Sequence, residues 1–298
     1  MGKSKWIMSE SHIYAVASLC FELINCQQWL HTREMAGYAA FERKHVSGNF
    51  LFQLAVGNGP LLSVEKRGAT FGWDATQCFV DKTDEGYQVT LQTADHLPCV
   101  MQVSNDWRHC LVLSNVSDPH DFAYSLQAFI QLVYVYRASF YQTLLLHASV
   151  VVVNDRALLL LGKSGAGKST HARLWVDMYA DCFLLNDDNP VVRKSAEGQW
   201  YVYGSPWSGK SQCYIDAQAE ISGFLRVKQA DYNRVSRASG PHRFSLLYPA
   251  CSVLYWDAVV RQQTLNILAN LTLSSQVGEL ACRVDAAAVA CSRQFCGV

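Results

Sequence analysis

The feature that most restricts the fold is a glycine-rich stretch between Gly162 and Ser169. It reads Gly-Lys-Ser-Gly-Ala-Gly-Lys-Ser and fits the pattern G-x-x-x-x-G-K-[ST] without a mismatch. An apolar run at residues 157–161 enters it, and good helix formers at residues 168–179 follow it. In this order, a strand, a glycine-rich turn and a helix aim backbone N–H groups and the positive end of a helix dipole at phosphate. The stretch therefore predicts a phosphate-binding loop (P-loop) for a nucleoside triphosphate with Mg²⁺.

Each part of this loop has an expected role. Lys168 supplies a cation for the β- and γ-phosphates, and the Ser169 hydroxyl reaches the magnesium ion. The alternative is an ordinary Gly-rich turn, which the strand before it and the helix after it disfavour. We assign nucleotide binding to Gly162, Lys163, Ser164, Gly165, Ala166, Gly167, Lys168, Ser169 and Thr170.

Two adjacent carboxylates follow the next apolar run. Residues 183–185 predict a strand, and Asn186, Asp187 and Asp188 come directly after it. The metal partner of a P-loop lies at the end of such a neighbouring strand. Adjacent side chains of an extended chain point to opposite sides, so one carboxylate can hold magnesium while the other faces an acceptor. Which aspartate takes which role stays open, and two solvated loop aspartates are the alternative.

In the first third of the chain, the spacing of apolar residues changes near Gly48. Before it, residues 14–29 carry apolar side chains at helical spacing and predict an amphipathic helix. After it, short apolar runs separated by turn signals predict a mainly antiparallel β region without a catalytic motif. The expected strands are residues 50–56, 60–64, 77–80, 87–91, 99–103 and 110–113.

The second part of the chain predicts a long buried helix and then a hairpin. The helix is expected over residues 122–140, and the hairpin joins residues 144–153 to 157–161 through the turn residues Asn154 and Asp155. The fold class is therefore α/β with α+β character. We expect two domains, an N-terminal helix plus β-rich domain at residues 1–118 and a nucleotide-binding domain at residues 119–298.

Composition restricts the functional classes. The 298 residues include 25 basic and 25 acidic side chains, so the zero net charge does not favour nucleic acid or an anionic membrane as a partner. The 11 cysteines include no pair with zinc-knuckle or thioredoxin spacing. We find no signal peptide and no apolar run of membrane-spanning length, and we expect a cytoplasmic protein with reduced thiols.

With these residues in view, the chain resembles the HPr kinase/phosphorylase family and its wider relatives of the phosphoenolpyruvate carboxykinase-like fold. The resemblance covers roughly residues 140 to 290 and depends on residues 146–149, 162–170 and 185–190. It implies a P-loop core with a mixed sheet, and ATP with Mg²⁺ as cofactors. Members of the family often form closed rings, so a homo-oligomer is an open expectation.

The resemblance also implies catalytic roles. Asp187 would be the general base toward an acceptor hydroxyl, and Asp188 would lie near the metal with Ser169. His147, on the first strand of the hairpin, would sit beside the acidic pair and act with Lys168. A lone His between apolar residues is otherwise more often a core residue than a catalyst.

Two further residues are expected near the ligands. Arg234 resembles an arginine that the family directs toward the triphosphate, and Arg226 and Arg237 are alternatives. Lys210, on a Gly-Pro-rich loop, would suit a substrate phosphate or carboxylate, or is simply an exposed lysine. The sequence also departs from true HPr kinases, because no carboxylate stands near Gly204 where they carry a metal-binding Glu.

Three functions fit these features. The first is an ATP-dependent kinase that transfers the γ-phosphate to a hydroxyl of a protein, peptide or small molecule. The second is a carboxykinase-like nucleotide-dependent lyase, which needs a second metal site with His and Lys. The third is a regulatory ATP-binding or ATPase module that transfers no phosphate to its partner. An acidic residue placed as a base favours the kinase.

Overall fold

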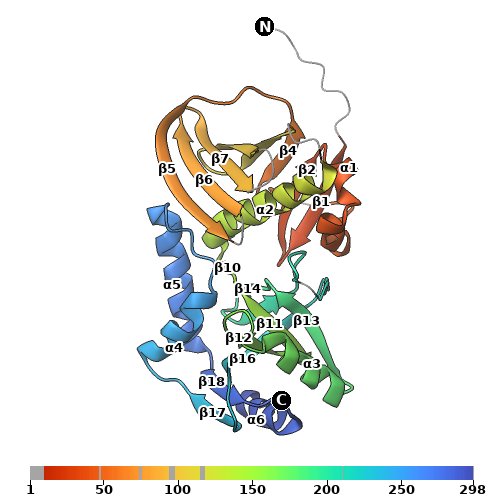
Figure 1. The fold of residues 1–298 in the computed structure, drawn as a ribbon, viewed down its shortest axis with the longest axis vertical. Helices are drawn as coiled ribbons and strands as arrows, with labels where there is room; N and C mark the ends of the chain where they lie inside the picture. Colours follow the sequence, from red (N-terminus) through yellow and green to blue (C-terminus); the bar gives the residue numbers. More distant parts are fainter. Residues whose placement is uncertain are drawn as a thin grey trace. The chain divides into compact units, whose positions relative to one another are not determined.

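The computed structural model describes residues 10–46, 48–73, 76–93, 98–114, 118–209 and 211–297. The chain forms two compact units, Met1–Arg137 and Ala138–Val298 (Figure 1). The sequence-based boundary at residue 118 falls earlier, because helix α2 (Pro119–Ala138) packs with the first unit. In that unit the Tyr134 hydroxyl donates to the Val16 carbonyl at 3.0 Å.

Within the described residues, unit 1 contains a nine-stranded sheet in the order β3-β1-β2-β4-β9-β8-β7-β6-β5, and α2 runs across it (Figure 1). Most neighbours are antiparallel, but β2 with β4 and β4 with β9 are parallel, so the sheet is mixed. Two short helices, α1 (Gln27–Leu30) and η1 (Arg33–Phe41), join β2 to β3. The strands are β1 (Ser11–Val16), β2 (Leu19–Ile24), β3 (Glu42–Arg43), β4 (Gln53–Gly57), β5 (Val64–Trp73), β6 (Thr76–Thr83), β7 (Gly86–Thr93), β8 (Cys99–Ser104) and β9 (His109–Leu113).

The helix expected at residues 14–29 is wrong. These residues form the hairpin of β1 and β2, in which Val16 pairs with Leu19. The turn residues Ala17 and Ser18 have φ of 49° and 59°, a left-handed pair that turns the chain back in two residues. Along β2, buried and half-buried side chains alternate, which is the period of a strand. Residues 60–63 are not a strand either, since β5 begins at Val64.

Unit 2 contains a second nine-stranded mixed sheet within the described residues, with β10-β14-β15-β16-β12-β11-β13 in sequence and β18 and β17 branching from β16. Strands β12 and β16 are parallel, as are β16 and β18. The strands are β10 (Thr143–Leu145), β11 (Ala148–Val153), β12 (Arg156–Leu161), β13 (Cys182–Asp188), β14 (Val191–Lys194), β15 (Trp200–Tyr203), β16 (Gln218–Gln229), β17 (Arg234–Arg237) and β18 (Val277–Cys282).

Helices cover both faces of this sheet (Figure 1). One core joins the sheet to α4 (Pro241–Leu247) and α5 (Ala258–Ser274) through side chains such as Leu247 and Leu268. The other core joins it to α3 (Lys168–Met178) and α6 (Ala286–Cys296) through side chains such as Trp175 and Phe295. The fold is mixed α/β, and the two cores hold the strands between helical layers.

The expected hairpin before the glycine-rich stretch is confirmed for β11 and β12. Its first strand is shorter than expected, because residues 144–145 belong to β10, which pairs with β14, and His147 lies between β10 and β11. In the hairpin Val153 pairs with Arg156, and the two turn residues, Asn154 and Asp155, have φ of 50° and 58°. Strand β12 is buried along five of its six residues and ends at Leu161, directly before Gly162. The hairpin therefore fixes where the glycine-rich stretch leaves the sheet.

Candidate functional site

The Gly-rich loop, residues 162–167, joins the end of β12 to the start of α3. Gly162, Gly165 and Gly167 have φ of 148°, 78° and 102°, which L side chains rarely adopt. A Cβ added at Gly165 or Gly167 would meet no atom within 4 Å. The space beside the backbone is therefore open at Gly165 and Gly167.

Strand β16 contacts the Gly-rich loop and helps to hold it in place. A Cβ at Gly162 would lie 3.2 Å from the Val227 carbonyl of β16, so β16 passes close to it. From the end of β16, the Gln229 amide donates to the Gly165 carbonyl at 3.0 Å. The parallel pairing of β12 with β16 brings both strand ends to this place.

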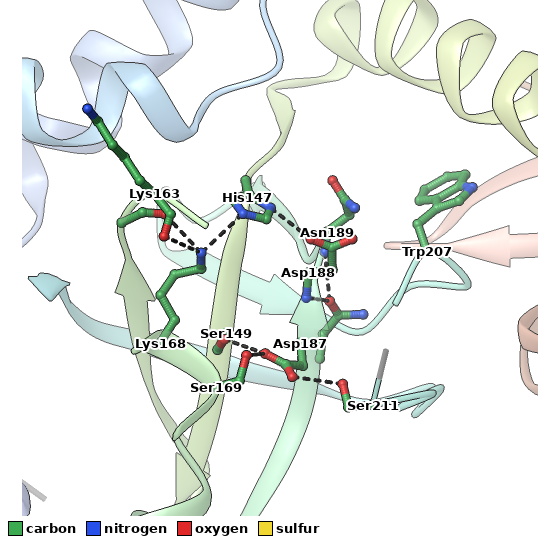
Figure 2. A network of polar contacts seen from close by, with 12 residues as sticks. His147, Ser149, Lys163, Lys168, Ser169, Asp187, Asp188, Asn189, Trp207 and Ser211 are labelled. Atoms are coloured by element: carbon green, nitrogen blue, oxygen red, sulfur yellow. Dashed lines mark hydrogen bonds and ion pairs between the residues drawn. The ribbon is translucent and has the colours of Figure 1, made fainter. Parts of the chain in front are cut away.

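Lys168 is the first residue of α3, and its side chain points back toward the start of the Gly-rich loop. Its Nζ donates to the Gly162 carbonyl at 2.9 Å and lies 3.1 Å from His147 Nε2 (Figure 2). Burial lowers the pKa of Lys168, and the nearby carboxylates of Asp188 and Asp187 oppose this effect. The lysine ammonium group is thus held by the Gly162 carbonyl and the His147 imidazole, and the carboxylates of Asp187 and Asp188 lie nearby.

Asp187 is buried on β13 and accepts hydrogen bonds from three serine hydroxyls. Its Oδ1 accepts from Ser169 at 2.9 Å and from Ser149, and its Oδ2 accepts from Ser211 at 2.8 Å (Figure 2). Ser149 faces Asp187 because the two residues pair between β11 and β13. The two carboxylate oxygens therefore face different surroundings, with Ser169 and α3 on the Oδ1 side and Ser211 on the Oδ2 side.

Asp188 is directed to a different partner, as expected for the next residue of a strand. Its Oδ1 lies 2.8 Å from His147 Nδ1, and both side chains are partly exposed, at 33% and 45%. With Lys168 donating to Nε2, the imidazole proton belongs on Nδ1, where it binds Asp188. Lys168, His147 and Asp188 therefore form one continuous polar chain (Figure 2).

The turn after the two aspartates is fixed by buried Asn186. Its Oδ1 accepts from the backbone N–H of Asp188 at 3.2 Å and of Asn189 at 3.0 Å. Its Nδ2 lies 3.2 Å from Ser205 Oγ. Asn186 therefore fixes the backbone of Asp188 and Asn189, where β13 ends.

The structure brings together five of the residues expected from the sequence: His147, Lys168, Ser169, Asp187 and Asp188. It does not place Arg234 with them, because β18 and β16 lie between β17 and β12. The alternative Arg226 is nearer, since it pairs directly with Leu161. The alternative Arg237 donates to the Phe295 carbonyl and lies over its ring.

The remaining residues expected at the site are not part of this cluster. Lys210 lies outside the described residues. Lys163, Ser164 and Thr170 are exposed around the loop. In the described part of the chain no group of three or more His, Cys, Asp or Glu residues is arranged to hold a metal ion. Among the same residues, no helix is both long and apolar enough to cross a membrane.

Sequence reasoning did not assign roles to Ser149, Ser211 or Asn186. Ser149 carried a usable signal, because the hairpin register and the neighbouring strand place it across from Asp187. Ser211 carried none, since it reaches Asp187 from an irregular stretch after β15.

Comparisons with known proteins include a partial structural similarity. No family model matches the chain, and no curated protein matches it in sequence. The Hpr(Ser) kinase/phosphatase from Coxiella burnetii is similar over 31% of this chain and 70% of that chain, with a TM-score of 0.23 and 14% identity. Values this low do not establish a shared fold or family, so the resemblance expected over residues 140 to 290 stays a prediction.

Proposed function

We propose that the chain is an ATP- and Mg²⁺-dependent phosphotransferase that moves the γ-phosphate to a hydroxyl acceptor, as HPr serine kinases do. One observation carries this proposal. The carboxylate of Asp187 binds the Ser169 hydroxyl at the start of α3 with one oxygen and a second serine hydroxyl with the other. A carboxylate that lies next to the glycine-rich loop and within hydrogen-bond distance of a second hydroxyl can take the proton of a hydroxyl that is phosphorylated.

The Gly-rich loop fits the phosphates of a nucleotide. Open space beside Gly165 and Gly167 leaves the loop backbone accessible, and α3 begins directly behind it. Backbone N–H groups and a helix N-terminus favour anions. Lys168 would exchange its bond to the Gly162 carbonyl for a phosphate oxygen, and this negative charge would stabilise the charged form of the lysine. In this assignment the loop is a P-loop.

The oxygen donors beside Lys168 fit magnesium. Ser169 supplies a hydroxyl oxygen and Asp188 a carboxylate oxygen, which are the donors that this hard cation prefers. Magnesium held there with the nucleotide would neutralise phosphate charge. Ser169 would direct its hydroxyl to the metal, which leaves Asp187 held by Ser149.

Asp187 serves as the base in this proposal, through Oδ2. That oxygen accepts a hydroxyl hydrogen at 2.8 Å, which is the distance range for proton transfer from an acceptor. Asp188 and His147 lie on the other side of the strand and bind one another next to Lys168. Their role is to hold the lysine and the metal in place. Arg226, which pairs with the last residue of β12, is better placed than Arg234 to meet phosphate charge.

Nucleotide binding is tested first by thermal unfolding. ATP with Mg²⁺ at about 100 times Kd stabilises a folded protein by about 2.7 kcal/mol, so we expect a rise in Tm of several degrees. Lys168→Ala should abolish this rise, whereas Lys194→Ala, on β14 and away from the cluster, should retain it. A wild-type Tm that does not respond to ATP and Mg²⁺ contradicts the proposal.

Phosphate transfer is tested next with Asp187→Asn. Products can be found by phosphoproteomics and metabolomics after overproduction of wild type and variant. Loss of a general base lowers the transfer rate about 10²- to 10⁴-fold, while nucleotide-dependent stabilisation should persist. The matched control is Asp181→Asn, an exposed aspartate just before β13. Unchanged products in Asp187→Asn would exclude it as the base, and a regulatory nucleotide-binding module would yield no such products at all.

A further inference from the structure

Ser211 differs from the other two serines that bind Asp187. Ser149 is fully buried on β11, and Ser169 belongs to α3 and faces the nucleotide side. Ser211 is half-buried and donates to Oδ2, the carboxylate oxygen that the other two do not contact. It therefore occupies the position where the proposed function requires an acceptor hydroxyl.

The backbone around Ser211 is held against the same strand. The Gly209 N–H donates to the Asp187 carbonyl at 3.1 Å, and Ser208 forms an isolated bridge with Asp188. On the other side of Ser211, Cys213 Sγ donates to the Leu184 carbonyl at 3.0 Å. Contacts on both sides of Ser211 thus keep its hydroxyl at the carboxylate.

Gly209 allows this close approach. A Cβ at this position would lie 3.1 Å from the Asp187 carbonyl oxygen and 3.2 Å from Asp188 Cβ, which is tighter than ordinary contact. A larger residue would push the backbone away by a few tenths of an ångström. The distance from Ser211 to Asp187 therefore depends on a glycine two residues earlier.

We propose that Ser211 is itself a phosphoacceptor, phosphorylated within its own chain by the nucleotide bound at the Gly-rich loop. This inference rests on the proposed function and names one acceptor for it. Ser211 Oγ forms a bond to the γ-phosphorus, and the bond from that phosphorus to the β–γ bridging oxygen breaks. ADP leaves with the electron pair, and the Ser211 proton passes to Asp187 Oδ2.

Two physical arguments support a reaction within one chain. The hydroxyl is already within hydrogen-bond distance of its base, which is the geometric requirement for general-base catalysis. Fixing an acceptor beside the reacting groups also replaces a bimolecular encounter by a unimolecular step. The rate per molecule is then independent of protein concentration.

Phosphorylation would also change the site. A phosphoserine carries about −1.5 to −2 charges at pH 7 and would lie next to Asp187 and Asp188. The hydroxyl that donates to Oδ2 would be lost, and like charges would repel. The modified Ser211 would leave the carboxylate, which frees Oδ2 for a hydroxyl of another molecule.

The test starts with phosphatase-treated full-length protein incubated with ATP and Mg²⁺. Intact-mass analysis should show the addition of one phosphoryl group, and fragmentation of the wild-type chain should locate it at Ser211. Ser211→Ala should lose the modification, whereas Ser211→Thr should keep it, because threonine also carries a hydroxyl. Ser195→Ala, on the turn between β14 and β15, is the matched control and should be modified like wild type.

Two further experiments separate reaction within a chain from reaction between chains. The fraction modified at a given time should be the same at low and high protein concentration. A Lys168→Ala chain mixed with wild type should remain unmodified. Gly209→Ala should slow modification and retain the nucleotide-dependent rise in Tm.

The outcomes distinguish this inference from the proposed function. A Tm that rises with ATP and Mg²⁺ without any phosphate on Ser211 overturns the inference and leaves nucleotide binding intact. Phosphate on another residue, or a rate that grows with protein concentration, also overturns it. If neither the Tm nor the mass responds to ATP and Mg²⁺, the proposed function fails and the inference fails with it.

Discussion

His171, two residues after Ser169 on α3, is a buried group whose protonation opposes folding. Its Nε2 lies 3.0 Å from Ser292 Oγ on α6, and its Nδ1 has no hydrogen-bond partner among the described residues. Burial lowers the pKa of His171 from 6.5 to about 4. The neutral imidazole thus ties the helix behind the Gly-rich loop to α6.

This pKa predicts a stability loss in mild acid. Between about pH 6.5 and 4 the unfolded chain binds a proton at His171 that the folded chain does not. The free energy of unfolding therefore decreases as the pH is lowered through this interval. The loss from this residue should be about 2 kcal/mol at pH 5. Urea denaturation at pH 7 and pH 5 measures it. His171→Gln should lose less than wild type over this interval, and the exposed control His45→Gln should match wild type. Equal losses in wild type and His171→Gln would contradict the assigned cause.

At the same scale, the sequence could predict part of the candidate site. Lys168, Ser169 and Asp187 follow from a local motif and from the strand that comes after it, and both are short-range patterns. The contact of Asp187 with Ser211 depends on how an irregular segment returns to β13 after β15, and no local pattern encodes such a return. The position of Arg234 could not be predicted from the sequence either, because it depends on the order of the strands in the sheet.

Among the elements, hairpins were predictable where their turn residues gave a signal. Asn154 and Asp155 accept left-handed backbone and mark the turn between β11 and β12. Ala17 and Ser18 give no such signal, although their backbone is also left-handed, so β1 and β2 were mistaken for a helix. Apolar residues close together fit either period when the turn between them is hidden.

The turn between β1 and β2 therefore carries strain that glycine would relieve. Ser18 is exposed and has φ of 59°, a conformation that costs an L-residue roughly 1 kcal/mol. Ser18→Gly should raise the free energy of unfolding of unit 1 by up to about 1 kcal/mol. Ser63→Gly is the control: Ser63 is exposed and is not among the positive-φ residues, so glycine there should not stabilise. A destabilised Ser18→Gly in denaturant titrations would contradict this account of the turn.

For the whole molecule, the sequence indicated two domains but did not show that helix α2 belongs to the first of them. The boundary was expected at residue 118, before the long helix. The helix belongs to unit 1 through contacts to residues far away in the chain, including the bond from Arg137 to the Leu51 carbonyl at 3.1 Å. Which sheet a helix covers is decided by such long-range packing and not by local periodicity.

Because every residue of the cluster around Lys168 and Asp187 lies in Ala138–Val298, nucleotide binding should be a property of unit 2 alone. Both helical layers and both cores of its sheet are built from residues of this unit. A chain of residues 138–298 should therefore fold and show the same rise in Tm with ATP and Mg²⁺ as the full chain, and it should lose this rise with Lys168→Ala. Circular dichroism confirms folding independently of the ligand. A folded fragment whose Tm does not respond to ATP and Mg²⁺, beside a full chain that does respond, would show that residues 1–137 contribute to the nucleotide site.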